Sequence, residues 1–285
     1  MKAAIAVVTP VYNGENSIQK AINSLLAQSF TNWVNIIVND GSTDGTSHIL
    51  KKYQKDDRFI ILNFKENKGR PHARQAALDK IRKLDIKYMA MLDADDWYYP
   101  DKLDFQYKFM EENPGVALLS MSIGLRSKNN VLYRVLEPYN TEKHLFFQSY
   151  DKYKTVPHAS SLLRVRTVES ICFDLSMKYS EDQDFMRRFL INNKYVFIPK
   201  VSYIYNRDES FSYQKYMKSK KSFLRSINKS SISRFKKIFI ILKERVKVLF
   251  LYFLFKFNRQ DIYLNKMGRQ PKIKEVQTFK ANAQT

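Results

Sequence analysis

The chain has 285 residues, 44% of them hydrophobic, with 49 Lys and Arg against 28 Asp and Glu and a formal net charge of +21. This length accommodates one large domain, or one domain with an appendage, and the hydrophobic share supports a buried core. The single cysteine, Cys172, excludes a disulfide framework and fits a reducing compartment. Because the apolar run before Pro10 is too short for a signal peptide, we expect the protein on the cytoplasmic side.

Strand and helix patterns alternate along the first hundred residues. The segments typical of strands are Ala4–Val8, Val34–Val38, Phe59–Asn63 and Tyr88–Leu92, and those with helical spacing are Ser17–Ala27, Thr46–Tyr53 and Arg70–Lys83. Continuous apolar strands between amphipathic helices predict an α/β fold with a mostly parallel sheet covered on both faces. Ligands of such sheets bind beyond the carboxyl ends of the strands. Polar residues follow three of the strands, at Thr9–Asn13, Asp40–Ser42 and Asp93–Asp96, and predict a site there.

The second half of the chain is less regular. Its expected elements are a helix at Pro100–Glu112, strands at Val116–Met121 and Val131–Val135 around an Asn129-Asn130 turn, a helix at Ser180–Asn192 and a strand at Tyr195–Ile198. From Gly268 onward the chain is polar and basic, and we expect it to be loosely ordered.

The positive charge is concentrated near the C-terminus. Residues 1–209 carry 30 Lys and Arg against 25 Asp and Glu, a net +5, whereas residues 210–285 carry 19 against 3, a net +16. The C-terminal part therefore predicts an acidic partner of its own, either phospholipid headgroups or nucleic acid.

A basic amphipathic stretch lies within this C-terminal part. From Ser230 to Phe257, apolar residues recur with helical spacing and are interleaved with Lys and Arg. The cluster at 243–247 falls in the middle, where each Lys or Arg costs about 3 kcal/mol inside a bilayer. We therefore expect residues 230–257 to lie in the interface of an anionic membrane. The alternative is a helix packed on the domain with a solvated basic face.

Three carboxylates follow the fourth strand, on Asp93, Asp95 and Asp96. Clustered like charges repel one another and favour a cation. Hard oxygen ligands suit Mg²⁺ or Mn²⁺, which take one or two carboxylates together with the phosphates of a substrate. An acidic turn after a strand is the alternative explanation.

Further motifs accompany this cluster in a fixed order. They are Val7-Val8-Thr9-Pro10-Val11-Tyr12-Asn13, then Val38-Asn39-Asp40-Gly41-Ser42-Thr43-Asp44-Gly45-Thr46, then Asn67-Lys68-Gly69 with Ala73-Arg74, and more loosely His158-Ala159-Ser160-Ser161 and Glu181-Asp182-Gln183-Asp184-Phe185. Together with Leu92-Asp93-Ala94-Asp95-Asp96 they resemble the family 2 glycosyltransferases with the GT-A fold. The resemblance implies a nucleotide-sugar donor, Mn²⁺ or Mg²⁺, and inversion at the anomeric carbon.

The resemblance also implies a domain organisation. A GT-A domain would span residues 1–210, with a nucleotide-sugar-binding half at 1–112 and an acceptor-binding half at 113–210. The basic amphipathic part at 211–285 would associate with the membrane.

The donor is expected at the polar strand ends. Thr9, Pro10 and Tyr12 would offer backbone groups and a ring to the nucleobase. Asp40 would accept from the imide N–H of uracil, which favours a UDP-sugar, and an Asx-turn is its alternative role. Glu15 either reinforces this pocket or lies in the first turn of the following helix, where the helix dipole favours it.

The resemblance distributes the remaining donor contacts. Arg74 would reach the diphosphate, and Asp93, with Ala94 beside it, would hold ribose or sugar hydroxyls. Asp95 would bind the metal ion. Asp96 would either touch the sugar or orient Asp95.

The acceptor hydroxyl needs a general base that stands free of the metal. The resemblance assigns this role to Asp182. Glu181 and Asp184 are alternatives, and so is an acidic helix start without catalytic duty, which the helix dipole stabilises in any case.

Three positions have open roles. His158 lines the acceptor side, approaches the metal or is structural. Trp97 stacks on an acceptor sugar or packs in the core. Arg207 would contact phosphate when a loop closes over the donor.

With the basic C-terminal part, the resemblance implies an enzyme at the inner face of the bacterial inner membrane. Its expected acceptor is a glycan or glycolipid of the lipopolysaccharide, lipooligosaccharide or capsule type. The competing hypothesis is a basic nucleic-acid-binding protein. No nucleic-acid-binding motif accompanies the charge, so we expect no nucleic-acid partner. A processive synthase is disfavoured because the sequence has neither a cluster of spanning helices nor a Gln-x-x-Arg-Trp motif.

Overall fold

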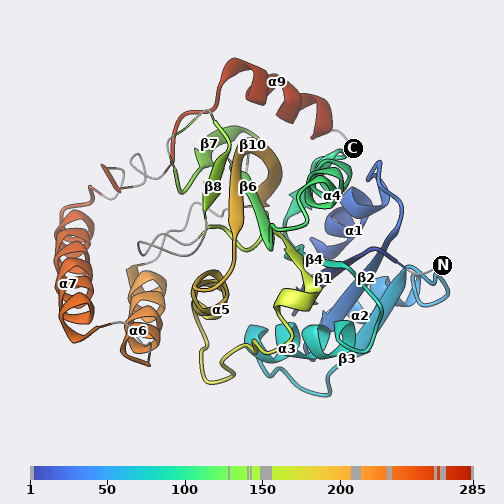
Figure 1. Cartoon of the computed structure of the whole chain (residues 1–285), viewed down its shortest axis with the longest axis horizontal. Helices are drawn as coiled ribbons and strands as arrows, with labels where there is room; N and C mark the ends of the chain where they lie inside the picture. The colour runs from blue at the N-terminus through green and yellow to red at the C-terminus, as the bar shows by residue number, and fades with distance from the viewer. Residues whose placement is uncertain are drawn as a thin grey trace.

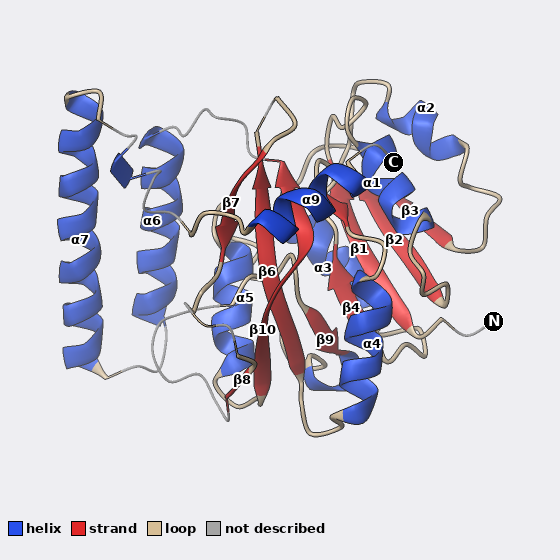
Figure 2. Ribbon diagram, turned by 90° about the horizontal axis from the view of Figure 1, so that it is seen from above, coloured by secondary structure: helices blue, strands red, loops and turns tan. Residues whose placement is uncertain are grey.

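The computed structural model describes residues 3–127, 129–139, 141, 143–147, 156–206, 213–229, 233–259, 262–263 and 268–283. A ten-stranded mixed sheet forms its centre, with helices on both faces (Figures 1 and 2). The strand order is β3-β2-β1-β4-β9-β6-β10-β5, and β7 and β8 pair with β6 and β10 respectively.

The elements alternate in the first half of the chain and become less regular in the second. The strands are β1 (Ile5–Val11), β2 (Trp33–Asn39), β3 (Phe59–Asn63), β4 (Tyr88–Met91), β5 (Trp97–Tyr98), β6 (Leu118–Arg126), β7 (Leu132–Leu136), β8 (Leu145–Phe147), β9 (Leu162–Arg164) and β10 (Tyr195–Asn206). The helices are α1 (Ile18–Leu26), α2 (Thr46–Lys51), α3 (Arg70–Ile81), α4 (Lys102–Glu112), α5 (Glu181–Leu190), α6 (Tyr213–Lys229), α7 (Arg234–Lys256) and α9 (Ile273–Asn282).

The first four strands form a parallel unit. β1 pairs in parallel with both β2 and β4, and β2 pairs in parallel with β3. Their carboxyl ends therefore meet at one edge of the sheet, which brings the predicted polar strand ends together. β10 and β6 form a second parallel pair, and β9 joins the two units by antiparallel pairing with β4 and β6. The predicted mostly parallel α/β sheet is confirmed.

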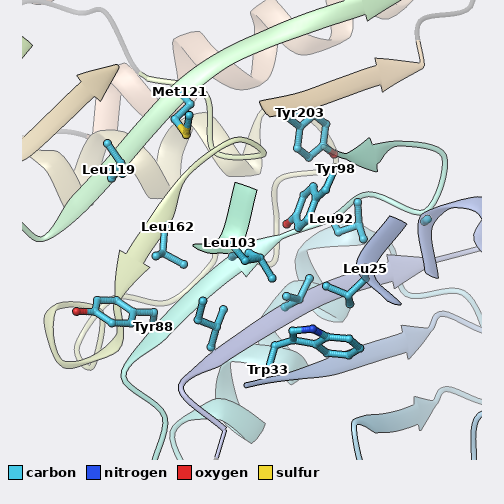
Figure 3. Packing of buried hydrophobic residues seen from close by; sticks show 14 of the residues in the cluster. Leu25, Trp33, Tyr88, Leu92, Tyr98, Leu103, Leu119, Met121, Leu162 and Tyr203 are labelled. Atoms are coloured by element: carbon cyan, nitrogen blue, oxygen red, sulfur yellow. The ribbon is translucent and has the colours of Figure 1, made fainter. Parts of the chain in front are cut away.

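Both faces of the sheet are buried, which explains the continuous apolar strands. Along β1, Ile5 and Val7 pack in a layer with residues of α1 and α4, whereas Ala6 and Val8 pack with α3 and α5. This split follows from the period of two along a strand. Figure 3 shows part of the first layer, in which residues of β5 and β10 meet residues from α1 and α4.

Several elements differ from the expectation. β1 continues to Val11, past the predicted end at Val8, and β10 runs on to Asn206. The helix α6 was not predicted, because its apolar residues are sparse among lysines. β5, β8 and β9 have only two or three residues each, too few for a period-two pattern to emerge.

The prediction that the C-terminal end is loosely ordered is wrong. The segment from Gly268 pairs with β7 through an isolated bridge and continues into α9, which lies across the β7–β10 side of the sheet (Figure 2). Arg269 forms ion pairs with Glu137 (2.9 Å) and Glu275 (2.6 Å). Ion pairs that join distant parts of the chain leave no periodic signal in the sequence.

A single aromatic side chain anchors α9. Phe279 is 1% exposed, and its ring lies 5.8 Å from that of Trp97, which immediately follows the acidic cluster. The C-terminal helix thus packs on the residue that directly follows the loop of Asp93, Asp95 and Asp96.

We predict that Phe279→Ala lowers the free energy of unfolding by about 3 kcal/mol, because it removes a buried ring and leaves a cavity beside Trp97. Urea denaturation measures this change, and limited proteolysis checks that cleavage begins within α9. Ile273→Ala on the same helix is the matched control, since Ile273 is 80% exposed. Equal stability of the two variants would contradict the anchoring role.

Candidate active site

A cavity of about 770 Å³ opens at the carboxyl edge of β1, β2 and β4. The strand ends contribute residues 10–14, Asp40 and residues 93–95. The segment at 67–73, which enters α3, forms another wall, and Tyr205 of β10 also lines the cavity. The volume suits a ligand of nucleotide-sugar size. The three polar strand ends therefore share one cavity.

The wall formed by β1 only partly follows the prediction. Thr9 is fully buried, and its hydroxyl accepts a hydrogen bond from Asn35 Nδ2 (3.1 Å). The Thr9 side chain is therefore not available to a ligand, and the backbone contact expected of Thr9 stays a prediction. Pro10 and Tyr12 do line the cavity, and Tyr12 is 48% exposed, which leaves its ring accessible to a base.

Hydrogen bonds tie the loops after β1 and β2 together. The Asn13 backbone N–H donates to Ser42 Oγ (3.0 Å), and Asn13 Oδ1 accepts from the Thr43 backbone N–H (2.9 Å). Glu15 Oε2 accepts from the Gly45 backbone N–H (2.7 Å). Glu15 is not among the cavity-lining residues. It therefore supports the predicted pocket from behind, by bracing the loop that carries Asp40.

Asp40 holds the loop that enters α3. Its Oδ1 accepts from the Lys68 backbone N–H and its Oδ2 from the Gly69 backbone N–H, both at 2.8 Å. A carboxylate has about four acceptor positions, so two of them are not used by these bonds. Asp40 also lines the cavity. The Asx-type bond of this loop is made instead by Asn39, whose Oδ1 accepts from the Ser42 backbone N–H (3.2 Å).

Arg74 joins two carboxylates beneath the cavity. Its Nη1 lies 2.8 Å from Glu181 Oε1, and its Nη2 lies 3.1 Å from Asp93 Oδ1. Burial alone would disfavour the guanidinium charge, but the two carboxylates outweigh it and raise the pKa of Arg74. The side chain is 5% exposed and does not line the cavity. The prediction that Arg74 reaches the diphosphate is therefore wrong for this arrangement.

Arg70, one turn earlier on α3, is the arginine that faces the cavity. Its side chain is 56% exposed, and its Nε lies 3.6 Å from Glu181 Oε1. Lys68 and Lys178 also line the cavity. None of these three cations was predicted as a site residue. One feature of the sequence could have identified Arg70 as a site residue. It lies directly after Gly69, at the start of a helix whose N-terminus attracts anions.

Asp93 and Asp95 both line the cavity, with Ala94 between them. Partial desolvation and, second, the negative charge of Asp93 raise the pKa of the Asp95 carboxyl, although the side chain is exposed. A cation at this point would relieve that repulsion. Among the described residues, no three His, Cys, Asp or Glu side chains gather into a metal site. The carboxylate oxygens of Asp93 and Asp95 are nevertheless of the kind that Mg²⁺ or Mn²⁺ prefers, and such an ion would also take phosphate oxygens and water as ligands.

Asp96 points away from the cavity. It is 2% exposed and accepts hydrogen bonds from the Tyr203 hydroxyl (2.5 Å) and the Asn206 backbone N–H (2.8 Å). Burial, together with Asp95 and Asp93, raises its pKa well above the usual range. Of its two predicted roles, contact with the sugar does not fit this position. Its bonds instead fix the acidic loop against β10, which orients Asp95.

Trp97 packs rather than stacks on a ligand. It is 6% exposed, lies beneath Phe279 of α9, and has Lys20 Nζ 3.3 Å above its ring. The predicted alternative of an acceptor-stacking ring does not fit this position.

The three acidic residues in the first turn of α5 have different partners. Glu181 is engaged by Arg74, and Asp184 forms ion pairs with Arg187 (2.7 Å) and Arg188 (2.8 Å). Within the described part of the chain, Asp182 has no hydrogen bond or ion pair, and it is half-buried. It does not line the cavity, but it is close enough to Arg74 to raise the pKa of that residue. Of the three, Asp182 alone is free of ion pairs with the other described residues and is not fully buried.

His158 is buried beside this helix. It is 4% exposed and stacks on Phe185 of α5, with ring centroids 5.5 Å apart. Burial and, second, the charge of Arg74 lower its pKa to about 4, so the imidazole is neutral at pH 7. Neither ring nitrogen has a hydrogen-bond partner among the residues that the structure describes. Arg207, the remaining predicted site residue, lies outside the described residues.

Comparisons with known proteins agree with this geometry. The family model described as "Glycosyl transferase family 2" matches residues 6–171. A Bacillus subtilis relative, the putative teichuronic acid biosynthesis glycosyltransferase TuaG, is 42% identical over 112 residues. That match covers 39% of this chain and 43% of the relative, so the chain spans less than half of that protein.

Two solved structures share the fold. S. aureus TarS (residues 1–349) in complex with UDP-GlcNAc superposes with a TM-score of 0.59 at 20% identity, covering 98% of this chain and 78% of that one. The Pyrobaculum calidifontis mannosyltransferase PcManGT, in complex with GDP-Man and Mn²⁺, gives a TM-score of 0.61 at 16% identity, covering 80% and 64%. At these identities the likeness establishes the GT-A architecture alone. The family model matches more than half of the length of this chain, and the chain therefore belongs to glycosyl transferase family 2.

Proposed function

We propose that the protein is an inverting glycosyltransferase that moves a sugar from a nucleotide-sugar, with a UDP-sugar as the first choice, to a hydroxyl of an acceptor glycan. The observation that carries this proposal is a cavity lined by Asp93, Asp95 and Arg70, together with the Asp182 carboxylate, which has no hydrogen bond or ion pair among the described residues. The UDP-sugar choice draws support from TarS, solved with UDP and with UDP-GlcNAc, and from the acceptor positions left on Asp40. Because PcManGT was solved with GDP-Man, nucleotide-sugars with other bases are included in the experiment below.

The proposed chemistry needs a base on one side and positive charge on the other. Asp182 takes the proton of the acceptor hydroxyl while the oxygen of that hydroxyl forms a bond to the anomeric carbon. The bond from that carbon to the diphosphate breaks, and its electron pair leaves with the nucleoside diphosphate. Arg70, Lys68 and Lys178 stabilise this negative charge from the cavity wall. Mn²⁺ or Mg²⁺ held by Asp95 would supply further positive charge to the diphosphate when bound.

For the acceptor, we propose a bacterial surface glycan of the lipopolysaccharide, lipooligosaccharide or capsule type. The name of TuaG, which refers to teichuronic acid biosynthesis, supports a role in building a glycan polymer. It does not distinguish among these acceptors.

We further propose that the protein works as a peripheral protein on the inner face of the bacterial inner membrane, with α7 on the lipid surface. None of the helices that the structure describes has the length and apolar character needed to traverse a bilayer. α7 nevertheless exposes large apolar residues, including Phe235 (88%), Phe239 (67%) and Val246 (67%), among its lysines. Such a helix suits the interface of an anionic membrane.

A donor screen tests the proposed activity. Purified full-length protein is titrated with UDP-, GDP- and dTDP-sugars in the presence of Mn²⁺, and nucleoside diphosphate release is followed in parallel. We expect a UDP-sugar at 100 times its Kd to raise the Tm by about 5 °C and to be slowly hydrolysed. If no nucleotide-sugar shifts the Tm of the folded protein or releases nucleotide, the proposal fails.

A further inference from the structure

A groove of about 570 Å³ runs between α6 and α7. The two helices lie side by side beyond α5, away from the cavity of the proposed active site (Figures 1 and 2). Its apolar lining includes Met217 and Leu224 of α6 and Val248 of α7. The cations Lys218, Lys221 and Arg245 also line it, and all three are exposed. The groove thus combines an apolar surface with a concentrated positive charge.

The positive charge of the groove is not neutralised by its own helices. Between residues 213 and 256 the sequence contains one acidic residue, Glu244. The Glu244 carboxylate lies 2.6 Å from Lys220 Nζ and 2.8 Å from Lys247 Nζ. Lys218, Lys221 and Arg245 therefore have no acidic partner within the described part of this helix pair. Among the described residues of α6 and α7, no carboxylate remains to neutralise these three cations, so an anionic ligand would find unpaired positive charge there.

A ligand that matches this groove carries a negative group next to a hydrocarbon chain. A free phosphate or a nucleotide would leave the apolar lining in contact with water, and a neutral lipid would leave the three cations unpaired. A phospholipid with an anionic headgroup satisfies both parts. The exposed apolar residues of α7 extend this surface along the same helix. We propose that the groove between α6 and α7 binds one anionic phospholipid molecule.

This proposal rests on the proposed membrane association and makes it specific. A diffuse basic surface would hold the protein near a bilayer without fixing its orientation. A lipid bound in a defined groove would fix one orientation of the protein relative to the bilayer. α6 links the groove to the proposed active site, because its other face packs on α5. Ser219 Oγ lies 2.7 Å from Ser180 Oγ, at the start of α5, and Ser226 hydrogen-bonds Asp184 and Arg187. A lipid in the groove would therefore orient the helix that carries Asp182 relative to the membrane.

The first arm of the experiment tests membrane association itself. Full-length protein is co-sedimented with vesicles of phosphatidylglycerol and phosphatidylcholine, or of phosphatidylcholine alone, and a gel shift on random DNA is run in parallel. We expect binding to the anionic vesicles only. Binding to DNA without binding to vesicles would overturn both the membrane association and the groove.

The second arm tests the groove with a lipid in monomeric form. Dihexanoyl phosphatidylglycerol below its micelle concentration is titrated by calorimetry into the full-length protein, and we expect saturable binding at one lipid per chain. Glycerol phosphate tests the headgroup without chains, and dihexanoyl phosphatidylcholine tests the chains without net charge. Equal binding of glycerol phosphate would identify a plain anion site. If the anionic lipid shows no saturable binding, the groove is not a lipid-binding site and the proposal fails.

Two triple variants with the same change in charge separate the groove from the general charge of the helices. Lys218→Gln, Lys221→Gln and Arg245→Gln together should weaken monomeric lipid binding about 100-fold. The control combines Lys236→Gln, Lys243→Gln and Lys256→Gln, at exposed positions of α7 outside the groove lining, and should change it less than about threefold. An equal loss in both would contradict a defined site.

Nucleotide-sugar hydrolysis in solution is measured on the same variants, with the Tm as a check on folding. Unchanged hydrolysis together with lost lipid binding supports the groove and leaves the proposed activity intact. If lipid binding is unaffected by the groove variant while hydrolysis proceeds normally, the groove proposal alone fails. If the wild-type protein binds the lipid but hydrolyses no nucleotide-sugar, the proposed activity alone fails.

Discussion

Replacing Asp182 with asparagine is expected to lower the rate of sugar transfer about 10²–10⁴-fold, the usual contribution of a general base. The substitution keeps the size of the side chain and removes its ability to take a proton. Donor affinity should change by less than about threefold, because Asp182 does not line the cavity where the donor is proposed to bind. Single-turnover transfer and titration with a UDP-sugar measure the two quantities separately.

The neighbouring acids provide matched controls on the same helix turn. Asp184→Asn should lower the Tm, since Asp184 holds Arg187 and Arg188, while the folded fraction keeps its transfer rate. Glu181→Gln should loosen Arg74 and weaken donor binding through Asp93. If Asp182→Asn transfers sugar at the wild-type rate and Asp184→Asn does not, the base has been assigned to the wrong carboxylate.

The parallel half of the fold was predictable because its information is local. Each of the first four strands is a short apolar run, and burial on both faces produces such runs. The polar residues that end these strands predicted where the cavity would lie, since parallel strands present their carboxyl ends at one edge. Pro10, Tyr12, Asp40, Asp93 and Asp95 all line that cavity, as the pattern indicated.

The individual roles within the site were less predictable because they depend on distant partners. Arg70 and Arg74 lie one turn apart on the same helix, and helix propensity does not indicate which of the two arginines faces the cavity. Arg74 is withdrawn from the cavity by Glu181, 107 residues later in the chain. Asp96 is likewise turned away by the hydroxyl of Tyr203, also 107 residues later. Contacts at such separations depend on how the two halves of the sheet pair through β9, which local sequence patterns do not reveal.

The course of the C-terminal end also escaped the sequence patterns. Its composition is polar and basic, which by itself favours weak order. One buried ring, Phe279, and the two ion pairs of Arg269 are enough to dock it on the sheet. The part of the C-terminal region that was predicted from its helical periodicity, α7, is a helix at Arg234–Lys256. Periodicity therefore identified the amphipathic helix and missed the docked one.

The second large effect is expected from Asp95→Asn. Transfer should fall about 10³-fold, because the developing charge on the diphosphate loses the metal that Asp95 is proposed to hold. The Tm without metal should not decrease, since the substitution removes a carboxylate that Asp93 repels and that has no stabilising hydrogen bond to another described residue. In the wild-type protein, Mn²⁺ added with UDP should raise the Tm. In Asp95→Asn the same addition should have little effect beyond that of UDP.

Asp96→Ala is the matched control, one residue along the same loop. It should lower the free energy of unfolding by about 2 kcal/mol, because the Tyr203 hydroxyl and the Asn206 backbone N–H lose their buried acceptor. Its folded fraction should still respond to Mn²⁺ with UDP, since Asp93 and Asp95 remain, but more weakly than the wild type, because the loop that carries Asp95 has lost its bonds to β10. The two variants thus separate a metal ligand from a structural carboxylate within one cluster. Full transfer by Asp95→Asn after metal removal would show instead that the cations Arg70, Lys68 and Lys178 alone stabilise the leaving diphosphate.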